Sequence, residues 1–207
     1  MKNSFIYLVA LIFLINFETR AENLNIKSKN IIVDKKTEVT IFKDEVYIKD
    51  EKENIIRSDY AEYNKKTNLI KLENNVNATD AKGNNFKTKQ ALYNEKLKLF
   101  ESFGETTIST SGGSVIKTEN VIFDNLKGVI FSNKETILTD FQNNEILLNN
   151  FEYQINSNIF KSIGKIKITD NLKNSYEFSQ IYLNEKTKEI VGSDAKLYLN
   201  QDDFKPN

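Results

Sequence analysis

The side chains that most often carry enzyme chemistry are scarce in this chain. Its 207 residues include no histidine, the usual general base near neutral pH, and no cysteine, which excludes thiol nucleophiles and soft metal sites. Serine and lysine are neighbours at 28–29 and at 161–162. Because adjacent residues of a strand point to opposite faces, these neighbours are not positioned as nucleophile and base.

Carboxylates and glycines give no stronger candidate for a catalytic or binding site. Asp44, Glu45 and Asp50 lie in stretches typical of solvated turns. The aspartates at 202–203 lack the regular ligand spacing of a calcium loop, and the glycines at 112–113 lack the lysine and the following helix of a phosphate-binding loop. We therefore predict no enzyme activity, no metal site and no cofactor.

The most regular feature of the sequence is a thirty-residue repeat. Six windows stay in phase without an insertion, at 27–50, 57–80, 87–110, 117–140, 147–170 and 177–200. In the fourth window, apolar segments at 121–123, 129–131 and 136–139 are typical of short strands, and polar turns separate them at 124–125 and 133–134. A fixed period of this size indicates a repeated supersecondary unit that cannot bury its apolar face alone.

Aligning the windows shows which residues share one face of the predicted strands. One column contains Ile31, Ala61, Ala91, Val121, Phe151 and Ile181. Two residues further on, and so on the same strand face, stand Val33, Tyr63, Tyr93, Phe123, Tyr153 and Leu183. A third apolar column contains Ile48, Ala78, Ile108, Leu138, Ile168 and Tyr198. Polar turn columns lie at Asp34, Asn64, Asn94, Asp124, Gln154 and Asn184, and at Asp44, Asn74, Gly104, Lys134, Gly164 and Asp194. The fold is therefore predicted to be all-β, with two or three short strands in each unit and almost no helix.

Residues 1–21 are predicted to be a secretory signal peptide, and 22–207 the folded domain. Lys2 precedes an uncharged apolar run at 5–15, and 19–21 supplies the cleavage spacing. The run is short for a membrane span, which makes a retained single-span anchor the less favoured alternative. After cleavage, 27 basic and 28 acidic side chains remain, a balance that counts against nucleic acid as a partner.

The repeated motifs resemble a known family. They are S-D-Y-A-E-Y-N at 58–64, T-K-Q-A-L-Y-N at 88–94 and S-Q-I-Y-L-N at 179–184, with turn-strand segments at 74–76 and 104–106. Over about residues 24–200 this pattern resembles the OstA-like family of lipopolysaccharide-transport proteins, including the LptA-like periplasmic members. The segment 198–204 is also similar to the periplasmic region that precedes the barrel in the outer-membrane lipopolysaccharide-assembly protein.

The resemblance implies an elongated, open antiparallel β-jellyroll in the periplasm, here built from six repeats of about 30 residues. Its apolar groove would shelter the acyl chains of lipopolysaccharide (lipid A). Sheets that each have one apolar face, stacked by repetition, also predict a long apolar trough. The residues expected to line it are Ile31, Val33, Ala61, Tyr63, Ala91, Tyr93, Val121, Phe123, Phe151, Tyr153, Ile108, Leu138 and Ile168. The same side chains could instead fill a dry core, and the sequence leaves both alternatives open.

Two other functions compete with lipid transport. An exported structural or adhesive β-solenoid would share the repeat but bind no lipid. A hydrolase on a β-helix would need carboxylates or Arg–Lys pairs clustered on one exposed face, and the repeat columns contain none.

The two ends of the predicted sheet are expected to be unprotected edges. The first strand, near 31–33, and the last, near 196–199, contain no proline. Such edges accept strands from other sheets. We therefore expect edge-strand addition, either head-to-tail between copies of this chain or with other jellyroll transport proteins.

Overall fold

Every regular element in the described part of the chain is a β-strand, as predicted. The computed structural model describes residues 24–51, 53–140, 142–184, 186–187 and 189–200, so the expected signal peptide at 1–21 and the aspartates at 202–203 lie outside it. The strands are β1 (Asn25–Lys27), β2 (Asn30–Asp34), β3 (Val39–Lys49), β4 (Ile55–Asn64), β5 (Leu69–Thr79), β6 (Asn85–Asn94), β7 (Leu99–Ser109), β8 (Val115–Glu119), β9 (Ile122–Asp124), β10 (Val129–Ser132), β11 (Thr136–Thr139), β12 (Glu145–Leu148), β13 (Phe151–Gln154), β14 (Ile159–Thr169), β15 (Ser175–Asn184), β16 (Glu189–Ser193) and β17 (Lys196–Tyr198). Within these ranges no helix is long and apolar enough to cross a membrane.

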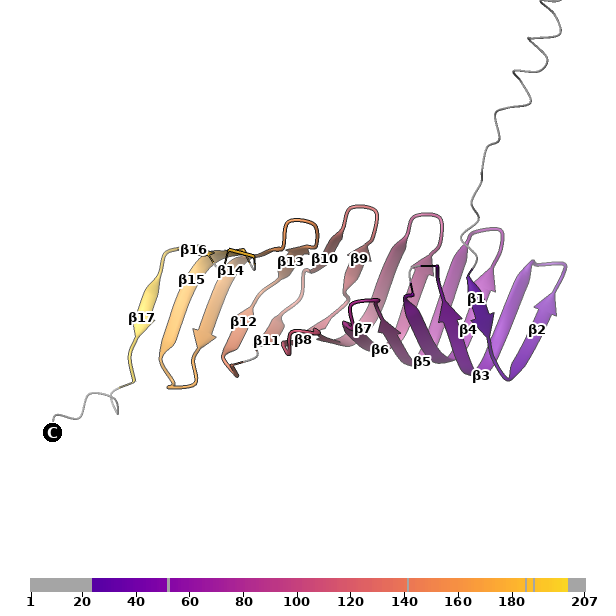
Figure 1. The fold of residues 1–207 in the computed structure, drawn as a ribbon, viewed down its shortest axis with the longest axis horizontal. Helices are drawn as coiled ribbons and strands as arrows, with labels where there is room; N and C mark the ends of the chain where they lie inside the picture. Colours follow the sequence, from indigo (N-terminus) through magenta and orange to yellow (C-terminus); the bar gives the residue numbers. More distant parts are fainter. Residues whose placement is uncertain (1–23, 52, 141, 185, 188, 201–207) are drawn as a thin grey trace, which may run out of the picture.

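All strands belong to one antiparallel sheet that follows chain order. Each long strand pairs with the next through a tight turn, as β3 does with β4 and β4 with β5. Figure 1 shows the result, a meander that advances along the long axis from β2 to β17. Strands β3, β5, β7, β10 and β14 begin thirty residues apart, so the sequence period is the period of the sheet. The number of six units stays a prediction, because the first and last windows contain shorter strands.

Each long strand bends at its middle. The pairing register shifts at these points, for example between Lys43 and Val46, and two successive residues there, Asp44 and Glu45, have φ values of 63° and 55°. These positions were expected to be turns between strands. The structure corrects this in β3, β5, β7 and β14, which continue through the bend in the same direction. A bulge with left-handed residues kinks a strand without reversing it.

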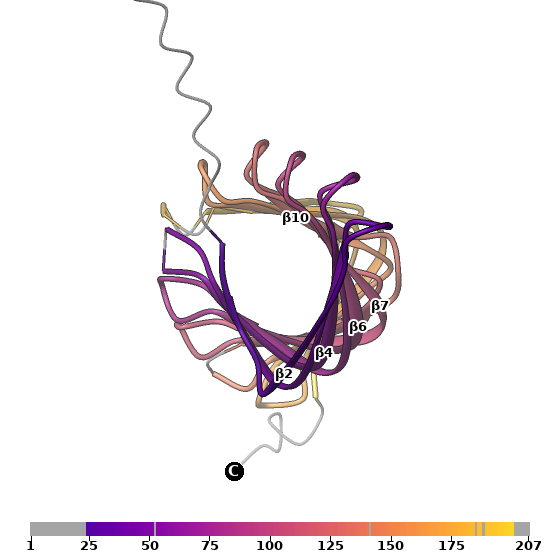
Figure 2. The same cartoon turned by 90° about the vertical axis from the view of Figure 1, so that its right-hand side faces the viewer.

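The bends divide the sheet into two leaves. Leaf one contains β2, β9, β10, β13 and β16 with the halves of the long strands that pair with them. Leaf two contains β1, β8, β11, β12 and β17 with the other halves. Viewed along the long axis, the strands curve around one interior (Figure 2).

The core lies between the two leaves because alternate side chains of every strand point inward. One cluster of buried residues contains Phe42, Val46, Ile48, Ala61, Ile70, Leu72, Val76, Ala91 and Phe100. A second contains Phe86, Ile108, Val121, Leu148, Phe151, Phe160, Ile166 and Ile181. Aromatic rings connect the clusters: Phe86 stacks on Phe123 with centroids 6.4 Å apart and meets Phe100 edge-on at 6.3 Å. The elongated sheet therefore has one continuous apolar interior.

The hairpin turns are held by side chains of the predicted polar column. Asp34 Oδ1 accepts a hydrogen bond from the Lys36 amide at 2.8 Å, and Asn64 Oδ1 accepts one from Lys66 at 3.0 Å. The opposite row of turns, at the far edge of leaf two, uses an aspartate and an asparagine four residues later. This pairing occurs at 50 and 54, 80 and 84, 140 and 144, and 170 and 174. This second motif recurs with the same thirty-residue period but was not among the predicted columns.

Candidate functional site between the two leaves

The predicted groove residues nearest the bend are buried in the interior. Ala61, Ala91, Val121 and Phe151 are each at most 2% exposed. They belong to leaf one and lie where it meets leaf two, so large side chains have little space there. This explains the two alanines, which would otherwise be unusual in strands.

The second predicted column lies further from the bend and is half-buried. Tyr63, Tyr93, Phe123 and Tyr153 pack against the core clusters. The Tyr63 hydroxyl donates to Glu95 Oε2 at 3.1 Å, and burial, followed by this hydrogen bond, raises the pKa of Tyr63. A ring in the interior with its hydroxyl at the rim is an arrangement suited to the mouth of an apolar groove.

Leaf two provides the opposite wall. Ile108 is buried, and Leu138 and Ile168 are half-buried against the second cluster. The remaining predicted residues, Ile31 and Val33, share the inward face by register but are 54% and 61% exposed. They lie on β2, the last strand at that end of leaf one, so no further strand covers them.

The structure adds interior residues that the sequence analysis did not select. One set is a leaf-two column formed by Ile26, Ile56, Phe86, Ile116 and Ile146. Another lies at the bend and contains Phe42, Val46, Leu72 and Val76. Both sets recur every thirty residues, and this signal would have identified them.

At the bend of the middle repeats, buried hydroxyl groups stand where other repeats have aliphatic side chains such as Val46 and Val76. We call these residues, Ser102, Thr106, Thr118 and Thr136, the hydroxyl seam. Ser102 Oγ accepts a hydrogen bond from the Val121 amide at 2.8 Å, and the Thr106 hydroxyl lies 2.7 Å from it. Thr136 Oγ1 and Thr118 Oγ1 are 2.9 Å apart. These groups bond to one another and to backbone atoms, which offsets the cost of burying them.

A small cavity remains between the leaves in the N-terminal half. Its volume is about 90 Å³, and its apolar walls are formed by Leu24, Ile48, Ile56, Ala78, Phe86, Tyr93, Phe100 and Phe123. At about 30 Å³ for a group the size of a water molecule, this is room for about three such groups. An acyl chain would fit only after the leaves move apart.

The interior offers apolar contact and little acid–base chemistry. The buried polar side chains of the described residues are serines and threonines. No group of three potential metal-ligating side chains occurs within the same residues. Such an interior can bind an apolar molecule by removing it from water.

Comparison with known proteins gives a family match and matches to several solved structures, one of which is described here. Residues 23–130 match the family described as "Lipopolysaccharide-assembly, LptC-related". The chain is also similar to a solved structure described as "Crystal structure of LptH, the LptA homologous periplasmic component of the conserved lipopolysaccharide transport device from Pseudomonas aeruginosa". The two are 8% identical, the TM-score is 0.24, and 87% of this chain and 97% of that chain are covered. No protein with a curated description matches.

Proposed function

Because the chain belongs to the lipopolysaccharide-assembly, LptC-related family, we propose that it is a periplasmic bridge that carries lipopolysaccharide towards the outer membrane. The acyl chains of lipid A would lie between the two leaves, and the sugars and phosphates would stay outside. Carriage of this kind requires no catalytic group. The resemblance to a lipopolysaccharide-transport family, predicted from the sequence, is confirmed by the family match.

The observation that carries this proposal is the continuous apolar interior with an aromatic rim. Inward side chains of β1 and of β3 to β15 form two adjoining clusters, and the rings of Phe86, Phe100 and Phe123 connect them. The path of apolar contact therefore follows the long axis of the molecule. An acyl chain placed on this path would gain about 0.8 kcal/mol for each buried methylene.

Loading would require the leaves to separate. The bend is the natural hinge, because its ladder is already interrupted by bulges and by left-handed residues such as Asn74 and Asn75. The contacts that oppose opening are those of the core clusters between the leaves, among them the Phe86–Phe123 stack. Lipid would replace this contact with a larger apolar one.

Both ends of the sheet are suited to continuing the groove into another molecule. All five residues of β2 are exposed, including Ile31, Ile32 and Val33. At the other end, Val191 and Leu197 are exposed on β16 and β17, which pair only with β15 among the described strands. Strand addition at either end would satisfy the free backbone groups and cover these side chains.

Mass spectrometry of the protein purified gently from a Gram-negative host tests the proposal. Co-purifying lipopolysaccharide is the expected result, and a Phe123→Asp variant that still folds should contain much less. A folded wild-type protein without lipopolysaccharide would favour the structural or adhesive β-solenoid.

A further inference from the structure

The outer face of leaf two has a row of basic side chains. Lys27, Arg57, Lys87 and Lys117 are exposed and recur every thirty residues on β1, β4, β6 and β8. Cross-strand pairing aligns them in one row, separated by Tyr47, Asn77 and Thr107. Because neighbouring strands are about 4.8 Å apart, successive cations lie roughly 10 Å apart.

These four cations have no ion-pair partner among the described residues. Arg57 lies over the Tyr47 ring, 5.3 Å from its centroid. Two acidic side chains close to this row have other partners. Glu45 pairs with Lys29, and Glu53 pairs with Lys49. The charge of the row is therefore available to another molecule.

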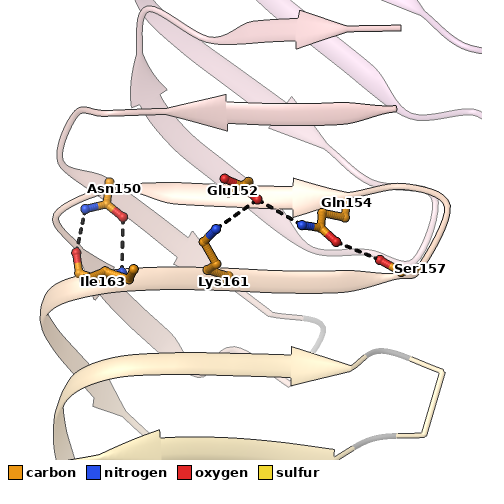
Figure 3. A network of polar contacts seen from close by, with 6 residues as sticks. All are labelled: Asn150, Glu152, Gln154, Ser157, Lys161 and Ile163. Carbon is orange, nitrogen blue, oxygen red and sulfur yellow. Dashed lines mark hydrogen bonds and ion pairs between the residues drawn. The ribbon is translucent and has the colours of Figure 1, made fainter. Parts of the chain in front are cut away.

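The outer face of leaf one is different, because it contains ion pairs within the protein, between Lys71 and Glu73 and between Lys161 and Glu152. Figure 3 shows Lys161 on β14 bonded to Glu152 on β13 at 3.1 Å, with Gln154 donating to the same carboxylate. The hydrogen bond from Gln154, followed by the one from Lys161, lowers the pKa of Glu152. In a separate contact at the bend, Asn150 bonds both the amide and the carbonyl of Ile163 on β14.

The row on leaf two continues into two exposed aliphatic side chains. Ile137 and Leu147 face each other on β11 and β12 and are 42% and 38% exposed. Lys117 lies directly opposite Ile137, and Lys167 lies directly opposite Leu147. Beyond Lys167 the row continues with Glu177 and Lys196. The aliphatic pair borders an open hollow of about 780 Å³. The carboxylates that also line this hollow are Glu105, Glu119 and Glu135. They lie towards the bend, and the cationic row runs beyond them.

We propose that the outer face of leaf two docks on an anionic lipid bilayer. The row cations would contact lipid phosphates, and Ile137 and Leu147 would enter the headgroup region. Basic side chains around exposed aliphatic ones are typical of surfaces that lie in the membrane interface. A soluble polyanion would use the lysines but leave the aliphatic pair without a partner. This surface faces away from the interior, so the proposal is independent of the lipid-carrier function.

Vesicle partitioning tests the charge component. The protein without residues 1–21, the form expected after cleavage, should bind phosphatidylglycerol-rich vesicles at low salt and bind phosphatidylcholine vesicles far less. Each cation near an anionic surface contributes about a fivefold change in partitioning, so Lys87→Gln with Lys117→Gln should weaken binding about 25-fold. The matched control is Lys66→Gln with Lys96→Gln, two exposed turn lysines of leaf one, which should change binding less than twofold. Equal losses in both double variants would overturn the proposal.

A fluorescent reporter tests the aliphatic component. The sequence contains no tryptophan, so Ile137→Trp introduces a single tryptophan, which can be excited apart from the tyrosines. Its emission should shift to the blue on phosphatidylglycerol-rich vesicles, whereas Val191→Trp, on the outer face of leaf one, should not shift. Two results would contradict docking: no shift at 137, or binding to soluble polyphosphate without binding to vesicles.

Discussion

Phe123 and Asp124 are adjacent at the end of β9, and their side chains point to opposite faces of the strand. The Phe123 ring packs in the interior, whereas Asp124 Oδ1 accepts the Lys127 amide in the exposed turn. We expect Phe123→Asp to lower the free energy of unfolding by about 3 kcal/mol or more, because it places an unpaired carboxylate against apolar groups. Asp124→Ala should cost far less, because it removes a hydrogen bond in an exposed turn and buries no charge. Urea titration measures both, and equal losses would show that the inward face has been assigned wrongly.

The hydroxyl seam makes a second residue-level prediction. Thr136 lies in the column occupied by Val46, Val76 and Ile166 in other windows, so valine fits the space. Thr136→Val removes a bond to Thr118 and should destabilise the protein by about 1 kcal/mol in urea titration. A variant more stable than wild type would mean that the seam contributes no net hydrogen-bond energy.

The Asp124 carboxylate is expected to make the stability of the protein depend on pH. Hydrogen bonds from the Lys127 side chain and amide lower the pKa of Asp124 below its ordinary value of 3.8. Its contribution to stability is therefore present above the unfolded pKa and is lost as the pH falls through the folded one. Asp124→Asn keeps an acceptor, as Asn64 and Asn94 do in the same column. Because asparagine loses the contact with the Lys127 ammonium, the variant should be less stable than wild type at pH 7, lose less stability between pH 5 and pH 2, and approach wild type at the acid end. Parallel pH curves for the two proteins would contradict this.

At the scale of elements, the period and alternation of the sequence predicted the strands well. The predicted segments at 121–123, 129–131 and 136–139 match β9, β10 and β11 within one residue. The error concerned the second polar column, because a bulge and a turn use the same residue types. Gly104 and Asn74 have positive φ values in these bulges, and a turn would require the same of them. Only the pairing on both sides of the bend distinguishes a kink from a reversal.

The inward position of the proposed groove residues could be predicted only in part, for the same reason. Alternation identified the inward columns of leaf one, including Ala61 and Phe123. It could not show which leaf-two column faces them, because that depends on how far each strand bends. The exposure of Ile31 and Val33 also follows from their place at the end of the sheet, which their own sequence context does not reveal.

The free edge of β2 makes a prediction about association. Neighbouring amides of a strand point to opposite sides, so of Ile31 and Ile32 one faces β3 and the other faces outward. Proline at the outward amide should weaken assembly with little change in stability, and proline at the other should break the β2–β3 ladder. Light scattering over a concentration series and urea titration separate the two effects. If neither variant changes association, β2 is not the contact.

At the scale of the whole molecule, an assembly made through these ends does not close. The contact joins different surfaces, β2 of one copy and β16 or β17 of the next, so oligomers should lengthen with protein concentration. Sedimentation measures the size distribution. A population that stops at a dimer would contradict head-to-tail growth, and a strict monomer would leave only a different jellyroll protein as the partner.

The central claim is that lipid lies between the leaves, and site-specific photo-crosslinking tests it most directly. A photoreactive phenylalanine analogue is placed at Phe123 or Tyr153, which face the interior, and at the adjacent Ile122 or Glu152, which face outward on the same strands. After irradiation in a Gram-negative host, lipopolysaccharide adducts are expected at 123 and 153 and not at 122 and 152. Equal labelling at inward and outward positions, or labelling at the outward ones alone, would contradict the account.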